Sequence, residues 1–472
     1  MIGLVRNKAL ALLLGPAGIG LAGLFSSITT LVGTITSFGI GGSGVRQMAE
    51  ANGTGDQVRV ARTAIIITRV VLVSNIIGAL VICLFCRPIS QATFGNSKFA
   101  GGVMLMGLVQ LFTGISGGQT CILQGLQRIR DLVNCQILGA VFGTVSSVAI
   151  VYFFRDRGVA MFLVANAGFA ILTSWWFVRR IHFVRPPVSL AETLSEAKQL
   201  AGFGISLMAS GILGSLVAYF TRIIVIHKLG LPATGQYQAA FTLSSYYVGI
   251  ILGAMGSGLF PRLSGLAHDH KEANRLLNEQ TEIGLLLATP GIIATLVAAP
   301  WVLQLLYTRD FVVATGIIQW QVVGVFFRMI SWPLWHLQLA KGLGRVFILT
   351  ESFFAGVQLL LNWVCINQWG LDGVGIAFAL YYIIHIAGMW LLCRRLSGFT
   401  WSRRVFLISL PGVLILGLTF AAVKWLPMLW GVGLGVGLCL LTCAGSFHGL
   451  QKVLGVNIKT MLLKRFAPNE AG

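Results

Sequence analysis

Six charged side chains lie inside stretches that are otherwise long and apolar. A charge within hydrocarbon is costly, so such a residue is expected to face a polar cavity or a partner. These residues are Arg6, Lys8, Arg69, Arg222, Arg328 and Glu351. Because basic residues dominate, a cavity lined by them would attract an anion, whereas a carrier of organic cations would need carboxylates deep in its spans.

Arg328 is the deepest of these charges, midway along its apolar segment. Gln321 and Trp332 fall on the same side of a helix through Arg328. A guanidinium binds phosphate oxygens in a forked geometry, and an indole face suits a sugar ring, so this face fits a phosphate beside sugars. Tight helix packing with Trp332 as an anchor explains the pattern equally well. Pro333 would also kink this helix.

The remaining basic residues lie nearer the ends of their segments. Arg69 is about a quarter of the way in from one end, and Arg222 lies towards the opposite side of the membrane, at the level of Arg6 and Lys8. At such depths a long side chain can extend to the interface, and this structural explanation is favoured over a ligand-binding role.

Motifs for catalysis, nucleotide binding or metal binding are absent from the sequence. The segment "GIGGSG" (39–44) follows an apolar span rather than a strand, so it does not indicate a nucleotide site. Cys83 and Cys86 form a lone C-x-x-C in an apolar helix, with no second pair for zinc. We therefore expect no enzyme, metal or cofactor. Glu351 is a candidate for coupling to a proton or sodium ion, or a partner for Arg345.

The composition predicts an all-α protein that crosses a membrane many times. Apolar residues make up 56% of the 472 residues and charged residues only 10%, too apolar for a soluble chain of this length. Thirteen full-length spans follow a short opening fragment. We place them at 19–40, 64–86, 101–124, 132–154, 159–178, 203–226, 237–260, 283–306, 312–338, 346–369, 374–393, 405–424 and 430–449.

The net charge of +20 is distributed unevenly across the predicted membrane. About three-quarters of the Lys and Arg in the connections fall on one side, which is therefore cytoplasmic and holds the C-terminus. The charge thus indicates topology, and we expect no nucleic-acid partner. Ser189 and Glu192 predict a capping box that starts a short amphipathic helix on the membrane surface within 185–201. The basic stretch 451–466 is expected on the same surface.

An internal repeat relates the first half of the chain to the second at a nearly constant offset in residue number. "GPAGIG" (15–20) aligns with "GLPATG" (230–235), which sets the offset at 215. At this offset Gly158-Val159 falls on Gly373-Val374, and close to it "QGLQRI" (124–129) resembles "KGLGRV" (341–346). The sequence therefore predicts two six-helix lobes in the same orientation, followed by two extra helices.

The start of the chain can be interpreted with the help of the repeat. There Gly15-Pro16 ends an apolar stretch of about fourteen residues, which is too short for a membrane span. A signal peptide is the alternative, but the Gly-Pro turn has its counterpart in the second half of the repeat. We expect the chain to begin halfway through its first helix, with roughly fifteen to twenty residues missing.

Longer motifs resemble those of the Wzx-type polysaccharide flippases. They are "NKALALLLGPAGIGLAG" (7–23), "GVRQMAE" (44–50), "LGLPATGQYQAAF" (229–241) and "GSGLFPRLSGL" (256–266). These flippases share a superfamily with the MATE multidrug exporters and the MurJ lipid II flippases. The resemblance implies two lobes around a central cavity that opens alternately to each side of the bacterial inner membrane. It also implies an undecaprenyl-diphosphate-linked oligosaccharide as substrate, the surrounding lipids as partners, and a polysaccharide polymerase and a chain-length regulator as further partners.

For this chain, the resemblance implies basic cavity residues that bind the diphosphate. Arg328 is the first candidate, with Arg6, Lys8 and Arg69 behind it and Arg222 as a further one. The expected organisation is a first lobe, a cytoplasmic linker, a second lobe, two additional spans and a cytoplasmic tail, at 1–180, 181–200, 201–395, 405–449 and 450–472. A MATE-like ion-coupled exporter, a membrane-embedded glycosyltransferase or polymerase, and an uncoupled scramblase are the alternatives.

Overall fold

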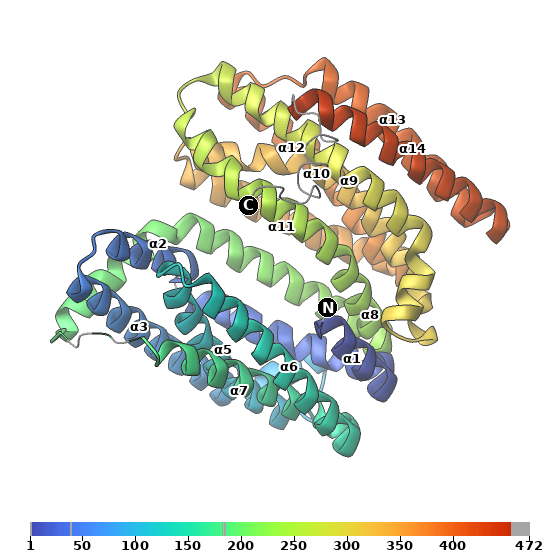
Figure 1. The fold of residues 1–472 in the computed structure, drawn as a ribbon. Helices are drawn as coiled ribbons and strands as arrows, with labels where there is room; N and C mark the ends of the chain where they lie inside the picture. Colours follow the sequence, from blue (N-terminus) through green and yellow to red (C-terminus); the bar gives the residue numbers. More distant parts are fainter. Residues whose placement is uncertain (1, 38–39, 182, 184–185, 455–472) are drawn as a thin grey trace, which may run out of the picture. The chain divides into compact units, whose positions relative to one another are not determined.

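The computed structural model describes residues 2–37, 40–181, 183 and 186–454, and over these residues the chain is helical without β-strands (Figure 1). The helices are α1 (Ile2–Thr36), α2 (Ile40–Gly53), α3 (Gln57–Leu84), α4 (Cys86–Phe94), α5 (Ala100–Gly125), α6 (Ile129–Phe154), α7 (Gly158–Val178), α8 (Leu190–Gly265), α9 (His270–Leu306), α10 (Thr315–Ala340), α11 (Gly344–Trp369), α12 (Asp372–Ser397), α13 (Arg403–Trp425) and α14 (Met428–Leu454). Two short 3-10 turns, η1 (Arg155–Arg157) and η2 (Arg309–Ala314), lie between them.

Eleven helical stretches of the described residues are long and apolar enough to cross a membrane. Two of them, Val5–Thr36 and Ile129–Val178, each cover most of two predicted segments, and Met208–Ser245 covers most of 203–226 and the first nine residues of 237–260. Each of the thirteen predicted spans, and the opening fragment, therefore overlaps one of the eleven stretches. A helix satisfies its own backbone hydrogen bonds, which lipid cannot do for it. The prediction of an all-α, multi-pass membrane protein is confirmed.

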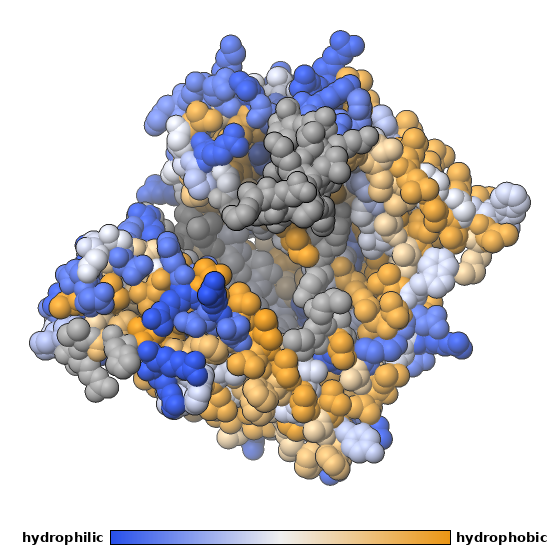
Figure 2. All heavy atoms as spheres, viewed as in Figure 1, coloured by the Kyte–Doolittle hydropathy of each residue, from blue (hydrophilic) through white to orange (hydrophobic). Residues whose placement is uncertain are grey.

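Large apolar side chains are exposed along many of these helices, as expected for surfaces that contact lipid. Leu84 and Phe153 are both 76% exposed, and Leu349 is 71% exposed. Figure 2 shows broad apolar areas on the face that it draws.

The chain divides into two compact units. The first comprises Met1–Ala239, Gln304–Val312 and Ile348–Trp363. Its packing includes one apolar cluster that joins α2, α3 and α5 and another that joins α5, α6 and α7. In Figure 1, α5, α6 and α7 lie side by side. The second unit comprises Ala240–Leu303, Val313–Phe347 and Val364–Gly472. There α10 packs closely on α12, where a Cβ on Gly375 would lie 2.8 Å from the carbonyl oxygen of Ile317.

Glycines interrupt α1 and α8 at equivalent positions of the repeat. Gly15 breaks α1 with φ 63° and ψ −169°, and Gly230 breaks α8 with φ 86° and ψ 178°. Both are left-handed conformations that glycine adopts without a Cβ penalty. The break predicted at Gly15-Pro16 is confirmed, and Gly230 is its counterpart at the repeat offset.

The same offset recurs elsewhere in the backbone. When the residue numbers are shifted by this offset, the bounds of α5 become those of α10, and the bounds of α6 become those of α11. Two further positive-φ positions obey it: Gln127 (57°) pairs with Gly342 (69°), and Arg155 (51°) pairs with Gly370 (56°). These shared conformations support a repeated unit, while the lobe boundaries stay a prediction.

The segment after the first six spans differs from the expected short surface helix. The capping box is present, since the Ser189 N–H donates to Glu192 Oε2 and the Glu192 N–H donates to Ser189 Oγ, each at 3.1 Å. The helix that it starts, however, continues without a break from Leu190 to the kink at Gly230. No proline lies between Pro187 and Pro232 to force a break, so the surface helix and the span that follows it can share one backbone helix. Of the predicted basic tail 451–466, residues 455–466 lie outside the described residues.

Candidate functional site

Arg328 lies in the middle of α10, as predicted, within the second unit. It is half-buried, and its guanidinium carbon lies 5.7 Å from the centroid of the Tyr382 ring on α12. A guanidinium at that distance is attracted to the π face of the ring, which fixes its position without using its N–H groups. Among the described residues, none accepts a hydrogen bond from these N–H groups, so they are available to a ligand.

The two predicted neighbours of Arg328 on α10 have different surroundings. Gln321 is 2% exposed, and its Oε1 accepts a hydrogen bond from Ser244 Oγ at 2.8 Å. Its role in the structure is therefore to join α10 to α8 within the second unit. Trp332 is half-buried, and its ring lies edge-on to His336 at 4.4 Å between centroids. The helix runs through Pro333 without an interruption.

Arg222 belongs to the first unit and is buried, with 6% of its surface exposed. Its Nε and Nη2 both donate to Gln238 Oε1, at 3.0 and 2.9 Å, and its Nη1 donates to the Ala218 carbonyl at 2.7 Å. Tyr237 presents its ring 5.7 Å from the guanidinium carbon. These contacts hold Arg222 firmly across the kink of α8, with much of its donor capacity used inside the protein.

Arg6 and Lys8 lie on the first segment of α1, also in the first unit. Lys8 Nζ donates to the carbonyls of Gln304, at 2.8 Å, and of Tyr307. These carbonyls lie at the C-terminal end of α9, where the last turn lacks intrahelical donors and a cation is favourable. Lys8 thus caps a helix. The Nε atom of Arg6 is buried and has no hydrogen-bond partner in the part of the chain that the structure describes.

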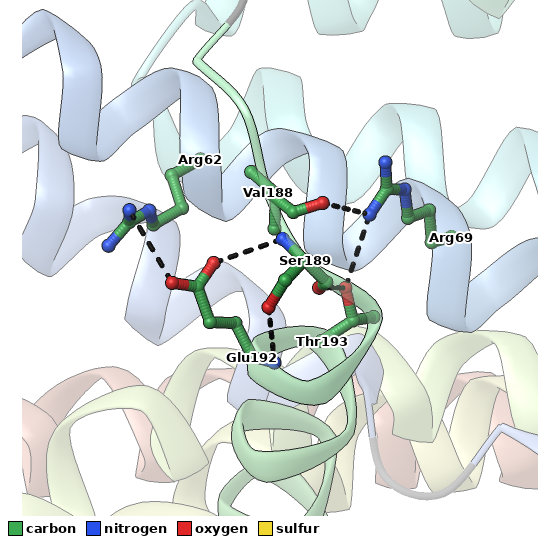
Figure 3. Close-up of polar contacts among 6 residues, drawn as sticks. All are labelled: Arg62, Arg69, Val188, Ser189, Glu192 and Thr193. Atoms are coloured by element: carbon green, nitrogen blue, oxygen red, sulfur yellow. Dashed lines mark hydrogen bonds and ion pairs between the residues drawn. The ribbon is translucent and has the colours of Figure 1, made fainter.

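Arg69 contacts the segment that leads into α8 (Figure 3). Its Nη1 donates to the Val188 carbonyl at 2.9 Å and, more weakly, to Thr193 Oγ1 at 3.4 Å. Arg62 lies 3.9 Å from Glu192 in a half-exposed ion pair, a contact worth less than about 1 kcal/mol. Arg69 and Arg62 therefore attach the start of α8 to α3.

Two carboxylates occupy helical positions in the apolar part of the chain. Glu351, the candidate for ion coupling, accepts a hydrogen bond from Ser210 Oγ at 2.7 Å in the first unit. Glu282 was not predicted as a candidate because it lies one residue before the predicted span 283–306. In the structure α9 already begins at His270, so Glu282 is a buried helical residue, 4% exposed, and accepts from Ser402 Oγ at 3.0 Å. Among the described residues, no group of three or more His, Cys, Asp or Glu side chains is placed to hold a metal ion.

An uncharged cavity of about 480 Å³ lies within the first unit, between α1, α3 and α5. Its walls are uncharged and consist largely of hydroxyl, amide and glycine residues. The sequence reasoning missed it, because that reasoning followed charged residues. The signal was nonetheless present, since Asn75 and Gln110 are amides inside predicted spans, and Gly114, Gly117 and Gly118 form a small-residue face.

Solved structures of two transporters share this fold. The lipid II flippase MurJ, in an inward closed conformation, aligns with a TM-score of 0.66 over 95% of this chain and 97% of its own, at 12% identity. An inward-facing multidrug resistance MATE family transporter of the MOP superfamily aligns with a TM-score of 0.65 over 84% of this chain and 95% of its own, at 16% identity. The fold is therefore that of the MATE and MurJ transport proteins.

The sequence comparison narrows this class. The model of a polysaccharide biosynthesis protein family matches residues 9–315, and the chain belongs to that family. It is also similar to the lipid III flippase of Escherichia coli strain K12, with 25% identity over 407 residues that cover 83% of this chain and 95% of the flippase.

Proposed function

We propose that this protein flips an undecaprenyl-diphosphate-linked oligosaccharide across the bacterial inner membrane by alternating access. The observation that carries the proposal is Arg328, a cation midway along α10 whose N–H groups bond to no described residue. A diphosphate is the group that best uses such a forked set of donors in a region of low dielectric. The similarity to a lipid III flippase over most of both chains supports the same function.

The chemistry of this substrate explains why a protein is needed. Moving sugar hydroxyls and a diphosphate through hydrocarbon without hydrogen-bond partners is prohibitively unfavourable. A polar path inside a helical protein replaces the lost hydration, while the lipid tail stays in the bilayer. The proteins to which this chain is similar are flippases and transporters rather than enzymes, which agrees with the absence of catalytic motifs.

The roles of the remaining candidate residues belong to this proposal. Arg328 binds the diphosphate, and Trp332 lies one turn away, placed to contact a sugar ring. Arg6 supplies a second basic group from α1, supported by its partnerless buried Nε. Lys8, Arg69, Arg222 and Gln321 serve mainly to fix helices, on the evidence of their protein contacts. Glu351 carries the coupling ion, with Ser210 as its hydrogen-bond partner.

The domain organisation enters the proposal in the same way. Two six-helix lobes at 1–180 and 201–395 are joined by a linker at 181–200, and a pair of helices at 405–449 follows. The common offset of four helix bounds and three pairs of positive-φ residues supports this division. The uneven distribution of Lys and Arg supports a cytoplasmic C-terminal tail. A polysaccharide polymerase and a chain-length regulator act on the substrate after it has been flipped.

The test is deletion of the gene followed by extraction and mass analysis of undecaprenyl-diphosphate-linked sugars. We expect single oligosaccharide units to accumulate while surface polymer disappears. Complementation with Arg328→Ala should fail, and Arg328→Lys should restore part of the activity because a point charge replaces the fork. Arg394→Ala is the matched control, since Arg394 also lies over an aromatic ring, 5.3 Å from the centroid of Trp390, but in the last turn of its helix.

Unchanged lipid-linked sugars in the deletion strain would overturn the proposal. A new sensitivity of that strain to cationic drugs would then favour a MATE-like exporter.

A further inference from the structure

We propose that the uncharged cavity of the first unit is a binding site for a neutral sugar ring of the substrate. The inference rests on the proposed function and adds a subsite that contains none of the charged candidates. The cavity is formed by α1, α3 and α5 within one compact unit. Its volume of about 480 Å³ falls in the range of small-molecule sites, roughly 300–1,000 Å³.

Threonine side chains contribute hydrogen-bond acceptors to the cavity wall. The hydroxyls of Thr30, Thr34 and Thr113 each donate to a carbonyl of their own helix, at 2.8, 2.7 and 2.7 Å. With the hydroxyl proton engaged in this way, each oxygen keeps a lone pair that can accept a hydrogen bond from a ligand. Sugar hydroxyls are donors of this kind, so the wall and a pyranose ring are complementary.

Two buried amides among the lining residues are held in place by hydrogen bonds. Gln110 and Asn75 are 2% and 5% exposed, and Gln110 Nε2 donates to Asn75 Oδ1 at 2.9 Å. Asn75 Nδ2 in turn donates to the Val71 carbonyl at 2.8 Å. These bonds fix both amides, while Gln110 Oε1 accepts no hydrogen bond from any described residue and remains available to a ligand. Fixed amide groups are typical of sites that select a ligand by its hydroxyl pattern.

Glycines on α5 create the space. A Cβ on Gly114 would overlap the amide of Asn75, so this position must remain glycine. Gly117 differs, because its Cβ would meet no atom within 4 Å and would project into the open cavity. At the repeat offset, Thr113 and Gly117 correspond to Arg328 and Trp332 of α10. The equivalent helix thus carries a cation and an indole where α5 carries a hydroxyl and empty space.

The neutral lining identifies the class of ligand. None of the residues that line the cavity is charged, so it offers no counter-charge to a diphosphate, an acidic sugar or a metal ion. An acyl chain has no hydrogen-bond donor to offer to Gln110 Oε1 or to the threonine oxygens, whereas the hydroxyls of a sugar ring are such donors. A neutral or N-acetylated pyranose satisfies those groups and fits the volume.

The test compares two soluble probes on the purified full-length protein in nanodiscs. The probes are farnesyl diphosphate and the same lipid diphosphate carrying one N-acetylglucosamine. The wild type should bind the sugar-bearing probe about tenfold more tightly or better, as two or three neutral hydrogen bonds would give. Gly117→Leu, which fills the cavity, should remove this preference and leave the affinity for farnesyl diphosphate unchanged. Gly101→Leu is the control, because Gly101 is also on α5 with no atom near its Cβ but does not line the cavity.

A second variant guards against a folding defect in Gly117→Leu. Thr34→Val with Thr113→Val keeps the side-chain shape and removes two acceptors, and it should reduce the sugar preference several-fold. Retention of the full preference in both variants overturns the inference, as does a wild type that binds the two probes equally. In either case the proposed function survives, because the lipid diphosphate still binds. Failure of the wild type to bind either probe instead overturns the proposed function.

Discussion

The crossing of α1 and α8 in the first unit offers a sharp test of the packing. A Cβ on Gly20 would lie 2.6 Å from the Leu231 carbonyl oxygen and 2.8 Å from the Gly235 nitrogen. A Cβ on Gly235 would in turn overlap the carbonyl oxygen of Pro16. Gly20 pairs with Gly235, and Pro16 with Leu231, at the repeat offset. The two helices therefore meet through equivalent atoms, and backbone approaches backbone directly.

Replacing Gly20 with Ala should destabilise the protein by about 2 kcal/mol. The new methyl group must move by roughly half an ångström or more from two backbone atoms that cannot rotate away, and such overpacking costs up to about 3 kcal/mol. The better helix propensity of Ala offsets about 1 kcal/mol of this. We expect a lower midpoint of thermal unfolding in detergent.

Gly214→Ala is the matched control for this substitution. Gly214 lies in α8, the helix that Gly20 of α1 contacts, and no atom lies within 4 Å of the position that its methyl group would take. The Gly214→Ala variant gains only the higher helix propensity of alanine, so its midpoint of thermal unfolding should equal or exceed that of the wild type. Equal midpoints for Gly20→Ala and Gly214→Ala would refute the close backbone contact between α1 and α8.

Two further substitutions probe the contacts of the first unit. Lys8→Met should cost about 1 kcal/mol of stability, because the Gln304 and Tyr307 carbonyls lose their donor at the end of α9. Lys8→Arg should keep most of that stability, because it still offers a cationic donor. Both variants are compared by thermal unfolding, and equal losses of stability would argue against capping. In a double-mutant cycle, Asn75→Leu and Gln110→Leu should each cost about 1–3 kcal/mol by leaving the other amide without its partner, and the double variant should cost less than their sum. Strict additivity would show that the two amides do not interact.

The sequence predicted those features that depend on local chemistry. The lengths of the apolar stretches predicted the spans, and the Gly-Pro pair predicted the break at Gly15. The Ser189 and Glu192 pair gave the cap, because both hydrogen bonds of a capping box form within a single helical turn. The predicted extent of the helix that follows this cap was wrong. A surface helix and the start of a span differ only in what surrounds them, not in backbone preference.

The candidate site was harder to predict, because a charged residue inside a span has two explanations that look alike in sequence. Lys8 and Arg69 donate to backbone carbonyls far along the chain, and neither Gln304 nor Val188 could be identified as a partner from spacing. Arg328 keeps its N–H groups free of described acceptors, whereas Arg222 does not, and in the sequence only depth along the span separates the two. Tertiary contacts alone distinguish a helix-fixing arginine from one that is available to a ligand.

The neutral cavity shows the opposite difficulty. Asn75 and Gln110 carry no charge, so reasoning that looks for charged residues inside spans does not identify them. A buried amide nevertheless also requires a hydrogen-bond partner inside the membrane. The repeat relates α5 to α10, and the same positions hold a hydroxyl and a glycine in one helix and a cation and an indole in the other. A substrate with a charged diphosphate and neutral sugars requires both kinds of surface. Divergence of two equivalent helices is a simple way to provide them, and it predicts that filling Gly117 and neutralising Arg328 will impair recognition of different parts of one molecule.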